Sequence, residues 1–283
     1  MAYKNKNALV STKWLAENLT KANVKIIDAS WYMPAEQRNP SAEFEDAHLP
    51  GAQFFDIDGI ADKNSDLPHM LPTAAEFARD VGTLGISNQD HVICYDGGYM
   101  ASASRAWWTF RAFGHNSVSV LDGGSKKWLQ EKRDMESGAT LPMPAHFNAE
   151  LQPGLVRDID DVLSLVTTAK GQEQIIDARS SGRFHGSDAE PRAGLRGGHM
   201  PGALNVPTPM VLNENGTMKA ERDLQGVFAA TGFAYDRPVV TTCGSGITAS
   251  LLALALFLIG HEDVAVYDGS WTEWGGRTDT PIV

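Results

Sequence analysis

Short apolar runs alternate with amphipathic stretches along this chain. Runs such as Val24–Ile27 and Val92–Tyr95 are almost continuously apolar and do not alternate with polar residues. Strands that are buried on both faces read this way, and they occur in mainly parallel sheets covered by helices. The longest apolar run, Leu251–Ile259, is far short of the about 18 residues that span a bilayer, so it predicts a buried helix. The pattern therefore predicts an α/β fold with a mainly parallel sheet flanked by helices on both faces.

The same order of segments occurs twice, which indicates a tandem duplication. The matched pairs are Ile26–Ser30 with Ile175–Arg179, His48–Ala52 with His199–Ala203, His91–Asp96 with Pro238–Cys243, and Val118–Gly124 with Val264–Ser270. The stretch between the halves, from 141 to about 154, is rich in proline and lacks periodicity. We predict a first domain over 1–140, a linker over 141–155 and a second domain over 156–283.

Cys243 stands between a predicted strand and a predicted helix. The preceding residues Val239–Thr242 are β-branched, and the residues after Ile247 are rich in alanine and leucine. The first N–H groups of a helix have no partner within it, so they favour a negative charge such as a thiolate. Gly244 and Gly246 are expected to adopt backbone angles barred to other residues, which would turn N–H groups toward the sulfur. The loop therefore predicts a nucleophilic cysteine.

The corresponding position in the first half is Asp96, so the two halves cannot share one chemistry. In parallel α/β sheets, ligands bind outside the carboxyl ends of the strands, and both positions lie at such an end. We expect the second half to be catalytic and the first to support it.

The composition of the chain limits the classes of binding partner and of cellular compartment. The net charge is −11 with no run of basic residues, which argues against a nucleic acid or an anionic membrane as partner. Cys94 and Cys243 are the two cysteines of the chain, which suits a reducing compartment. No export signal is evident near the N-terminus, and a cytoplasmic location is expected.

The chain resembles the tandem rhodanese-like sulfurtransferases, and within them the branch that uses 3-mercaptopyruvate. The resemblance covers nearly the whole chain. The segments that carry it are both His-x-Pro-Gly-Ala motifs, Phe55–Asp58, His69–Pro72, Ala106–Trp108, Gly182–Phe184, Glu190–Arg192 and the loop Cys243–Thr248. Thiosulfate-preferring members typically carry basic residues where this chain has Gly244 and Ser245, so the resemblance implies 3-mercaptopyruvate as donor and poor use of thiosulfate.

The resemblance also implies a mechanism without a metal or organic cofactor. Cys243 takes the sulfur of 3-mercaptopyruvate as a persulfide, pyruvate leaves, and a thiol such as thioredoxin or a low-molecular-weight thiol removes the sulfur. In an assay, cyanide can replace the thiol as the sulfur acceptor. Substrate binding is expected from Arg183, Arg192, Gly244, Gly246, Ile247 and Thr248. A proton relay is expected from Ser245, His69 and Asp58.

Other conspicuous residues have a structural interpretation. Cys94 lies inside an apolar strand and is expected to be a buried, inert thiol. His48 and His199 precede Pro-Gly in both halves, which indicates a shared turn and no catalytic role. The tryptophans are expected in the core or between the domains, and Arg179 is expected to be structural.

Two other functions remain open, and the sequence argues against a third. A thiosulfate:cyanide sulfurtransferase with an unusual loop is the nearest, and a non-catalytic module that carries sulfur is the second. A cysteine phosphatase also holds its cysteine in an anion-binding loop, but it needs an arginine six residues later, where this chain has Ala249.

Overall fold

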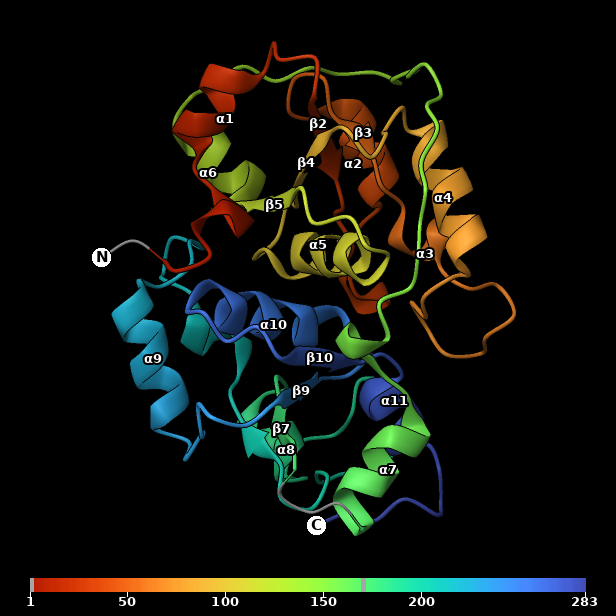
Figure 1. Cartoon of the computed structure of the whole chain (residues 1–283), viewed down its shortest axis with the longest axis vertical. Coiled ribbons are helices and arrows are strands. Elements are labelled where there is room, and N and C mark those ends of the chain that lie inside the picture. Colours follow the sequence, from red (N-terminus) through yellow and green to blue (C-terminus); the bar gives the residue numbers. More distant parts are fainter. Residues whose placement is uncertain (1–2, 169–171) are drawn as a thin grey trace.

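The computed structural model describes residues 3–168 and 172–283, which form two α/β domains of the same topology (Figure 1). Residues 1–2, where the first predicted domain begins, lie outside the described residues. Every pair of neighbouring strands in the two sheets is parallel, which confirms the predicted fold class.

The first sheet has the strand order β1-β5-β4-β2-β3. Its strands are β1 (Leu9–Val10), β2 (Val24–Asp28), β3 (Gln53–Phe54), β4 (His91–Tyr95) and β5 (Val118–Leu121). Ile27 pairs with Cys94 and Cys94 with Val120, so the centre of the sheet is apolar and buried.

The second sheet repeats this order as β6-β10-β9-β7-β8. Its strands are β6 (Val156–Arg157), β7 (Gln174–Asp177), β8 (Leu204–Asn205), β9 (Val239–Thr242) and β10 (Val264–Tyr267). β9 coincides with the strand that the sequence predicts before Cys243.

Helices cover both faces of each sheet (Figure 1). The first domain has α1 (Thr12–Asn18), α2 (Pro40–Asp46), α3 (Ile57–Ile60), α4 (Ala74–Thr83), α5 (Ala101–Ala112) and α6 (Gly124–Gln130), with 3₁₀ turns at Lys6–Ala8 and Pro34–Glu36. The second has α7 (Ile159–Thr167), α8 (Ser181–Phe184), α9 (Glu221–Ala229), α10 (Ile247–Leu258) and α11 (Ser270–Trp274), with 3₁₀ turns at Pro153–Leu155 and Thr208–Val211. Capping boxes fix where α4 and α7 begin, formed by Thr73 with Glu76 and by Asp158 with Asp161.

The helices that follow β4 and β9 form the contact between the domains. Figure 1 shows α5 and α10 side by side between the two sheets. Trp107 on α5 packs against Phe257 on α10 with ring centroids 5.6 Å apart, and Arg111 stacks on Phe257. Since α10 is apolar on all sides, it is buried all round, as the sequence predicts for Leu251–Ile259.

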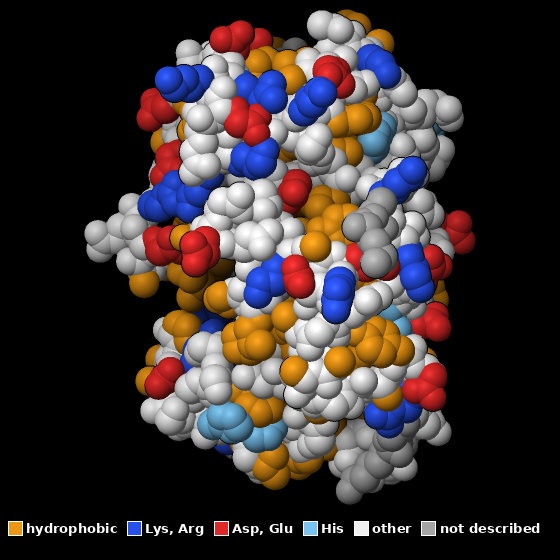
Figure 2. Space-filling model, turned by 90° about the vertical axis from the view of Figure 1, so that its left-hand side faces the viewer, with side chains coloured by type: hydrophobic (Ala, Val, Ile, Leu, Met, Phe, Trp, Pro, Cys, Tyr) orange, Lys and Arg blue, Asp and Glu red, His pale blue; other side chains and the backbone are white. Residues whose placement is uncertain are grey.

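Between the domains, residues 141–152 contain no helix or strand, and Leu141 and Met143 are exposed. On the face drawn in Figure 2, Lys and Arg side chains are interspersed with Asp and Glu and do not gather in one basic region. Among the described residues, none of the helices is both long and apolar enough to cross a membrane.

Candidate active site

Cys243 lies where the sequence predicts, between β9 and α10. β9 ends at Thr242, α10 begins at Ile247, and Cys243 is only 2% exposed. Gly246 has a φ of 78°, so it supplies the left-handed turn that leads the loop into the helix. Ile247 and Thr248 form the start of α10, the end of the helix that favours negative charge.

Ser270 holds the loop from inside, a role that the sequence did not reveal. Its hydroxyl accepts the N–H of Cys243 at 3.2 Å and the N–H of Gly246 at 3.1 Å, and it donates to the carbonyl of Tyr267 at 2.8 Å. Its φ of 48° is left-handed, which is costly for a residue with a β-carbon. The signal available in the sequence was its place in the repeat, where the first domain has Gly124.

The expected role of Gly244 was wrong in one respect. Its backbone is not left-handed, so its importance is space and not conformational freedom. A β-carbon on Gly244 would lie 3.1 Å from Nη2 of Arg183 and 3.8 Å from Nη1 of Arg192. The N–H groups of Cys243 and Gly246 also point to Ser270, so they are not the donors expected to face the sulfur.

Both predicted substrate-binding arginines therefore lie beside the residue that follows Cys243. The pKa of Arg192 is lowered by burial and by the like charge of Arg183, while Cys243 and Asp58 oppose this shift. Nη2 of Arg192 also lies 3.5 Å from Oγ of Ser245, which is itself buried.

Glu190 orients Arg183 from behind. Its carboxylate lies 2.5 Å from Nη2 of Arg183 and 2.7 Å from Nη1 of Arg179, with the Glu190 side chain 2% exposed. Arg179 also pairs with Asp177 and stacks on Trp271, so its expected structural role is confirmed. The segment Glu190–Arg192 carried the family resemblance, but the function of Glu190 became visible only in three dimensions.

The first domain contributes a second polar group. Nδ1 of His69 lies 2.5 Å from Oδ1 of Asp58, and the indole N–H of Trp31 donates to Oδ2 of Asp58 at 2.8 Å. Burial by itself raises the pKa of Asp58, but the hydrogen bonds from His69 and Trp31 outweigh it and bring the pKa below its ordinary value. Trp31 also packs edge-on against His69, so it holds Asp58 and His69 in addition to the packing role expected of the tryptophans.

One ring nitrogen of His69 has no partner among the described residues. Its side chain is 2% exposed, and its Nε2 has no hydrogen-bond partner within the described part of the chain. Because Asp58 orients Nδ1, Nε2 is the nitrogen left for a reacting group. Two residues after His69, the N–H of Leu71 donates to Oδ2 of Asp268 at 2.8 Å, so the two domains meet beside this histidine.

The counterpart loop in the first domain is filled by its own carboxylate. Asp96 accepts hydrogen bonds from the N–H groups of Gly98, Met100 and Ala103 and from the hydroxyl of Ser102. This arrangement places a carboxylate, hydrogen-bonded within its own loop, where the second domain has its thiol.

The residues expected to be structural behave as such. His48 and His199 each hydrogen-bond a carbonyl, that of Phe44 and Phe184 respectively, and each stacks on the same phenylalanine. Cys94 is fully buried in β4, and burial raises the pKa of its thiol well above its ordinary value.

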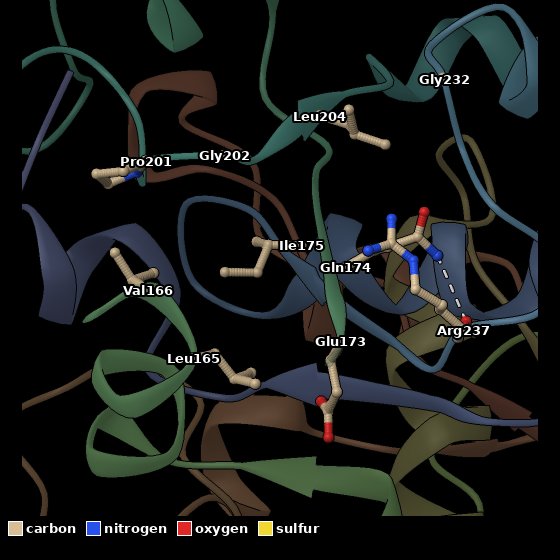
Figure 3. Close-up of a pocket in the computed structure, with 10 residues that line it drawn as sticks. All are labelled: Leu165, Val166, Glu173, Gln174, Ile175, Pro201, Gly202, Leu204, Gly232 and Arg237. Carbon is tan, nitrogen blue, oxygen red and sulfur yellow. Dashed lines mark hydrogen bonds between the residues drawn. The ribbon is translucent and has the colours of Figure 1, made fainter. Parts of the chain in front are cut away.

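A cavity of about 350 Å³ lies elsewhere, at the amino ends of the second sheet. Figure 3 shows Gln174, Ile175 and Leu204 among its lining residues, with Arg237 at one side. Within residues 3–168 and 172–283, no cluster of His, Cys, Asp or Glu is suited to hold a metal ion.

Fold and site together define a two-domain α/β protein with a buried cysteine in the loop between β9 and α10 and two arginines near that loop. A family profile described as the rhodanese-like domain matches residues 11–131 and again residues 159–277. The 3-mercaptopyruvate sulfurtransferase of Rattus norvegicus is 45% identical over 273 residues, which cover 94% of this chain and 91% of the relative. The chain belongs to the rhodanese-like family and is a sulfurtransferase.

Two further comparisons bear on the fold and the donor. The crystal structure of SseA, the 3-mercaptopyruvate sulfotransferase of Escherichia coli, superposes with a TM-score of 0.85 at 41% identity, covering 93% of this chain and 98% of that one. The thiosulfate sulfurtransferase of Gallus gallus is 43% identical over 276 residues, which cover 95% of this chain and 94% of that protein. Since these relatives carry different donors in their names, overall identity does not select the donor.

Proposed function

We propose that this enzyme transfers sulfur from 3-mercaptopyruvate to a thiol through a persulfide on Cys243 and releases pyruvate. The observation that carries the proposal is the position of Arg183 and Arg192, both within 4 Å of where a β-carbon on Gly244 would lie, directly after the buried Cys243. The catalytic part is the second domain, 156–283, joined by the linker 141–155 to the supporting domain 1–140.

The two guanidinium groups suit the donor's two acceptors. A carboxylate and a keto oxygen both accept hydrogen bonds, and arginine presents paired, permanently charged N–H donors. Arg183 is already oriented by Glu190, so less side-chain freedom is lost when it binds a substrate. Gly244 leaves both groups room beside the sulfur, and Gly246, Ile247 and Thr248 form the start of the helix that receives the negative charge.

The reaction balances without a cofactor. The thiolate of Cys243 forms a bond to the donor sulfur, and the carbon–sulfur bond breaks with its electron pair going to carbon, which gives the enolate of pyruvate. The proton of the donor thiol moves to that carbon. We assign its transfer to Ser245 and His69, with Asp58 orienting the imidazole. The persulfide is itself an anion, so the helix end that favours the thiolate also stabilises the intermediate.

A second thiol completes the cycle by attacking the outer sulfur and freeing Cys243. Thioredoxin and low-molecular-weight thiols are the proposed acceptors, and a cytoplasmic location is part of the same proposal. Gly244 and Ser245 bring no cation to the loop, so a thiosulfate dianion would rely on Arg183 and Arg192 alone. We therefore expect thiosulfate to load the enzyme poorly.

The test is intact-mass measurement of the protein after exposure to each donor, with peptide mapping. 3-Mercaptopyruvate should add one sulfur at Cys243 with release of pyruvate, and Cys243→Ser should abolish both while remaining folded. Equal loading by thiosulfate would contradict the choice of donor. Loading by neither donor would favour the sulfur-carrying module.

Arginine variants test donor recognition separately. Arg183→Ala should lower kcat/KM for 3-mercaptopyruvate roughly 30-fold, because a charge-assisted contact is lost. This factor corresponds to a loss of about 2 kcal/mol in transition-state stabilisation. Arg277→Ala is the matched control, since Arg277 also pairs with a single carboxylate, that of Asp279, but lies on the surface. Unchanged kinetics for Arg183→Ala would remove this residue from the site.

A further inference from the structure

Each domain accepts a hydrogen bond from the other through an aspartate that occurs at the same position of both repeats. Asp122 and Asp268 follow the last strand of their respective sheets. Oδ1 of Asp122 accepts the N–H of Met218 at 2.8 Å, and Oδ2 of Asp268 accepts the N–H of Leu71 at 2.8 Å. Leu71 lies three residues before α4 and Met218 three residues before α9, so these two interdomain hydrogen bonds are equivalent in the repeat.

Only one of the two equivalent contacts carries an ion pair. Nη2 of Arg105 lies 2.7 Å from Oδ1 of Asp268, with side chains 2% and 5% exposed, and the same nitrogen donates to the carbonyl of His69. Arg105 is the fifth residue of α5, and the fifth residue of α10 is Leu251. Both repeats therefore have the aspartate, but the arginine that pairs with it is present only at the contact beside His69.

His69 itself needs to be held. Its φ of 64° lies in the left-handed region, which residues with a β-carbon rarely adopt. The matching loop of the second domain has Gly216 there, with a φ of 79°, two residues before Met218. A strained residue persists only where its surroundings fix it, and such residues concentrate at functional sites.

The ion pair holds the backbone that directly follows the Cα of His69. Arg105 binds the carbonyl of His69, and Asp268 binds the N–H of Leu71 two residues later. Arg105 also reaches the cysteine loop, because a β-carbon on Gly246 would lie 2.6 Å from its Nη1. Asp268 stands two residues before Ser270, whose hydroxyl holds that loop.

We propose that Arg105 and Asp268 are positioning residues that hold the imidazole of His69 in register with Cys243 across the domain boundary. A buried ion pair is a poor source of net stability, and its best-attested use is to fix one arrangement among several. The inference rests on the proton relay in the proposed function. Arg105 and Asp268 do not touch the substrate in this proposal and act only through His69.

A double-mutant cycle tests the role. Pyruvate release from 3-mercaptopyruvate, with dithiothreitol as acceptor, is measured for Arg105→Met, His69→Ala and the double variant. Each single variant should lower kcat by about 100-fold, the scale of positioned proton transfer. If Arg105 acts through His69, the double variant should fall no more than about twofold below His69→Ala. Arg105→Lys, which keeps the charge, should recover part of the loss.

Asp122→Ala is the matched control, because it removes the equivalent interdomain hydrogen bond on the side without an arginine. It should leave kcat within about twofold of the parent. If Arg105→Met does not fold, Asp268→Asn replaces it in the cycle, since its amide oxygen still accepts the N–H of Leu71. Far-UV circular dichroism identifies folded variants.

Losses that multiply in the double variant would overturn the proposal, as would an equal loss in Asp122→Ala. If His69→Ala turns over normally, the relay and the positioning role are both wrong. In that case 3-mercaptopyruvate would still load sulfur onto Cys243. The mass measurement therefore tests sulfur transfer independently of the relay.

Discussion

Replacing Ser270 tests how the cysteine loop is held. The buried N–H groups of Cys243 and Gly246 share this hydroxyl as acceptor, at 3.2 and 3.1 Å. In Ser270→Ala both donors lose their partner, and each buried unpaired donor costs about 1 to 3 kcal/mol. We therefore expect the free energy of unfolding to fall by about 2 to 6 kcal/mol in this variant.

Ser270→Gly separates the hydroxyl from the backbone strain. Both variants lose the acceptor, but glycine adopts a φ of 48° without the steric penalty that alanine keeps. Ser270→Gly should therefore be more stable than Ser270→Ala by about 1 kcal/mol. The first domain already has Gly124 at this position, with a φ of 56°.

Urea titration gives the stability difference, and the rate of alkylation of Cys243 by iodoacetamide reports on the thiol. Ser250→Ala is the control: this buried serine donates to the carbonyl of Gly246, and its loss leaves no N–H unpaired. Ser270→Ala with parental stability would refute the reasoning about the loop. Ser270→Gly no more stable than Ser270→Ala would refute the reasoning about strain.

Three further predictions concern the surroundings of the site. Glu190→Gln should lower the free energy of unfolding by about 3 kcal/mol in urea titration, because it removes a buried carboxylate from between two guanidinium groups. Asp96→Ala should lower the melting temperature, because its carboxylate accepts four hydrogen bonds, while kcat per folded molecule stays unchanged. Burial lowers the pKa of His115 below its ordinary 6.5. The unfolded chain thus binds this proton more readily, so stability should decline as pH falls below about 6.5, and the urea midpoints of His115→Gln at pH 7.5 and 5.5 should differ less than those of the parent.

Local patterns were sufficient to predict the fold. β9 and α10 were predicted from the β-branched run before Cys243 and the apolar run after it, since periodicity and propensity are properties of neighbouring residues. The repeat was equally legible, and both sheets have the same strand order. Gly246 was correctly predicted to be left-handed, whereas Gly244 is not left-handed. The space that Gly244 leaves for Arg183 could not be predicted, because Arg183 belongs to a distant segment of the chain.

The site was only partly accessible in this way. Cys243 followed from its own loop, while Arg183, Arg192 and His69 required the family resemblance, because an isolated arginine or histidine carries no local signal. Trp31 was predicted to be packing, and its hydrogen bond to Asp58 depends on two segments that meet only in the folded domain.

The sequence by itself determined which segments are strands and helices, that the chain is duplicated, and that one repeat has a thiol where the other has a carboxylate. The tertiary structure decided what surrounds that thiol: the hydroxyl of Ser270, the carboxylate of Glu190, and the Arg105–Asp268 pair that joins the domains. The physical reason is distance along the chain. Secondary structure reflects interactions within a few residues, whereas these partners meet only after both sheets have formed and α5 has packed against α10.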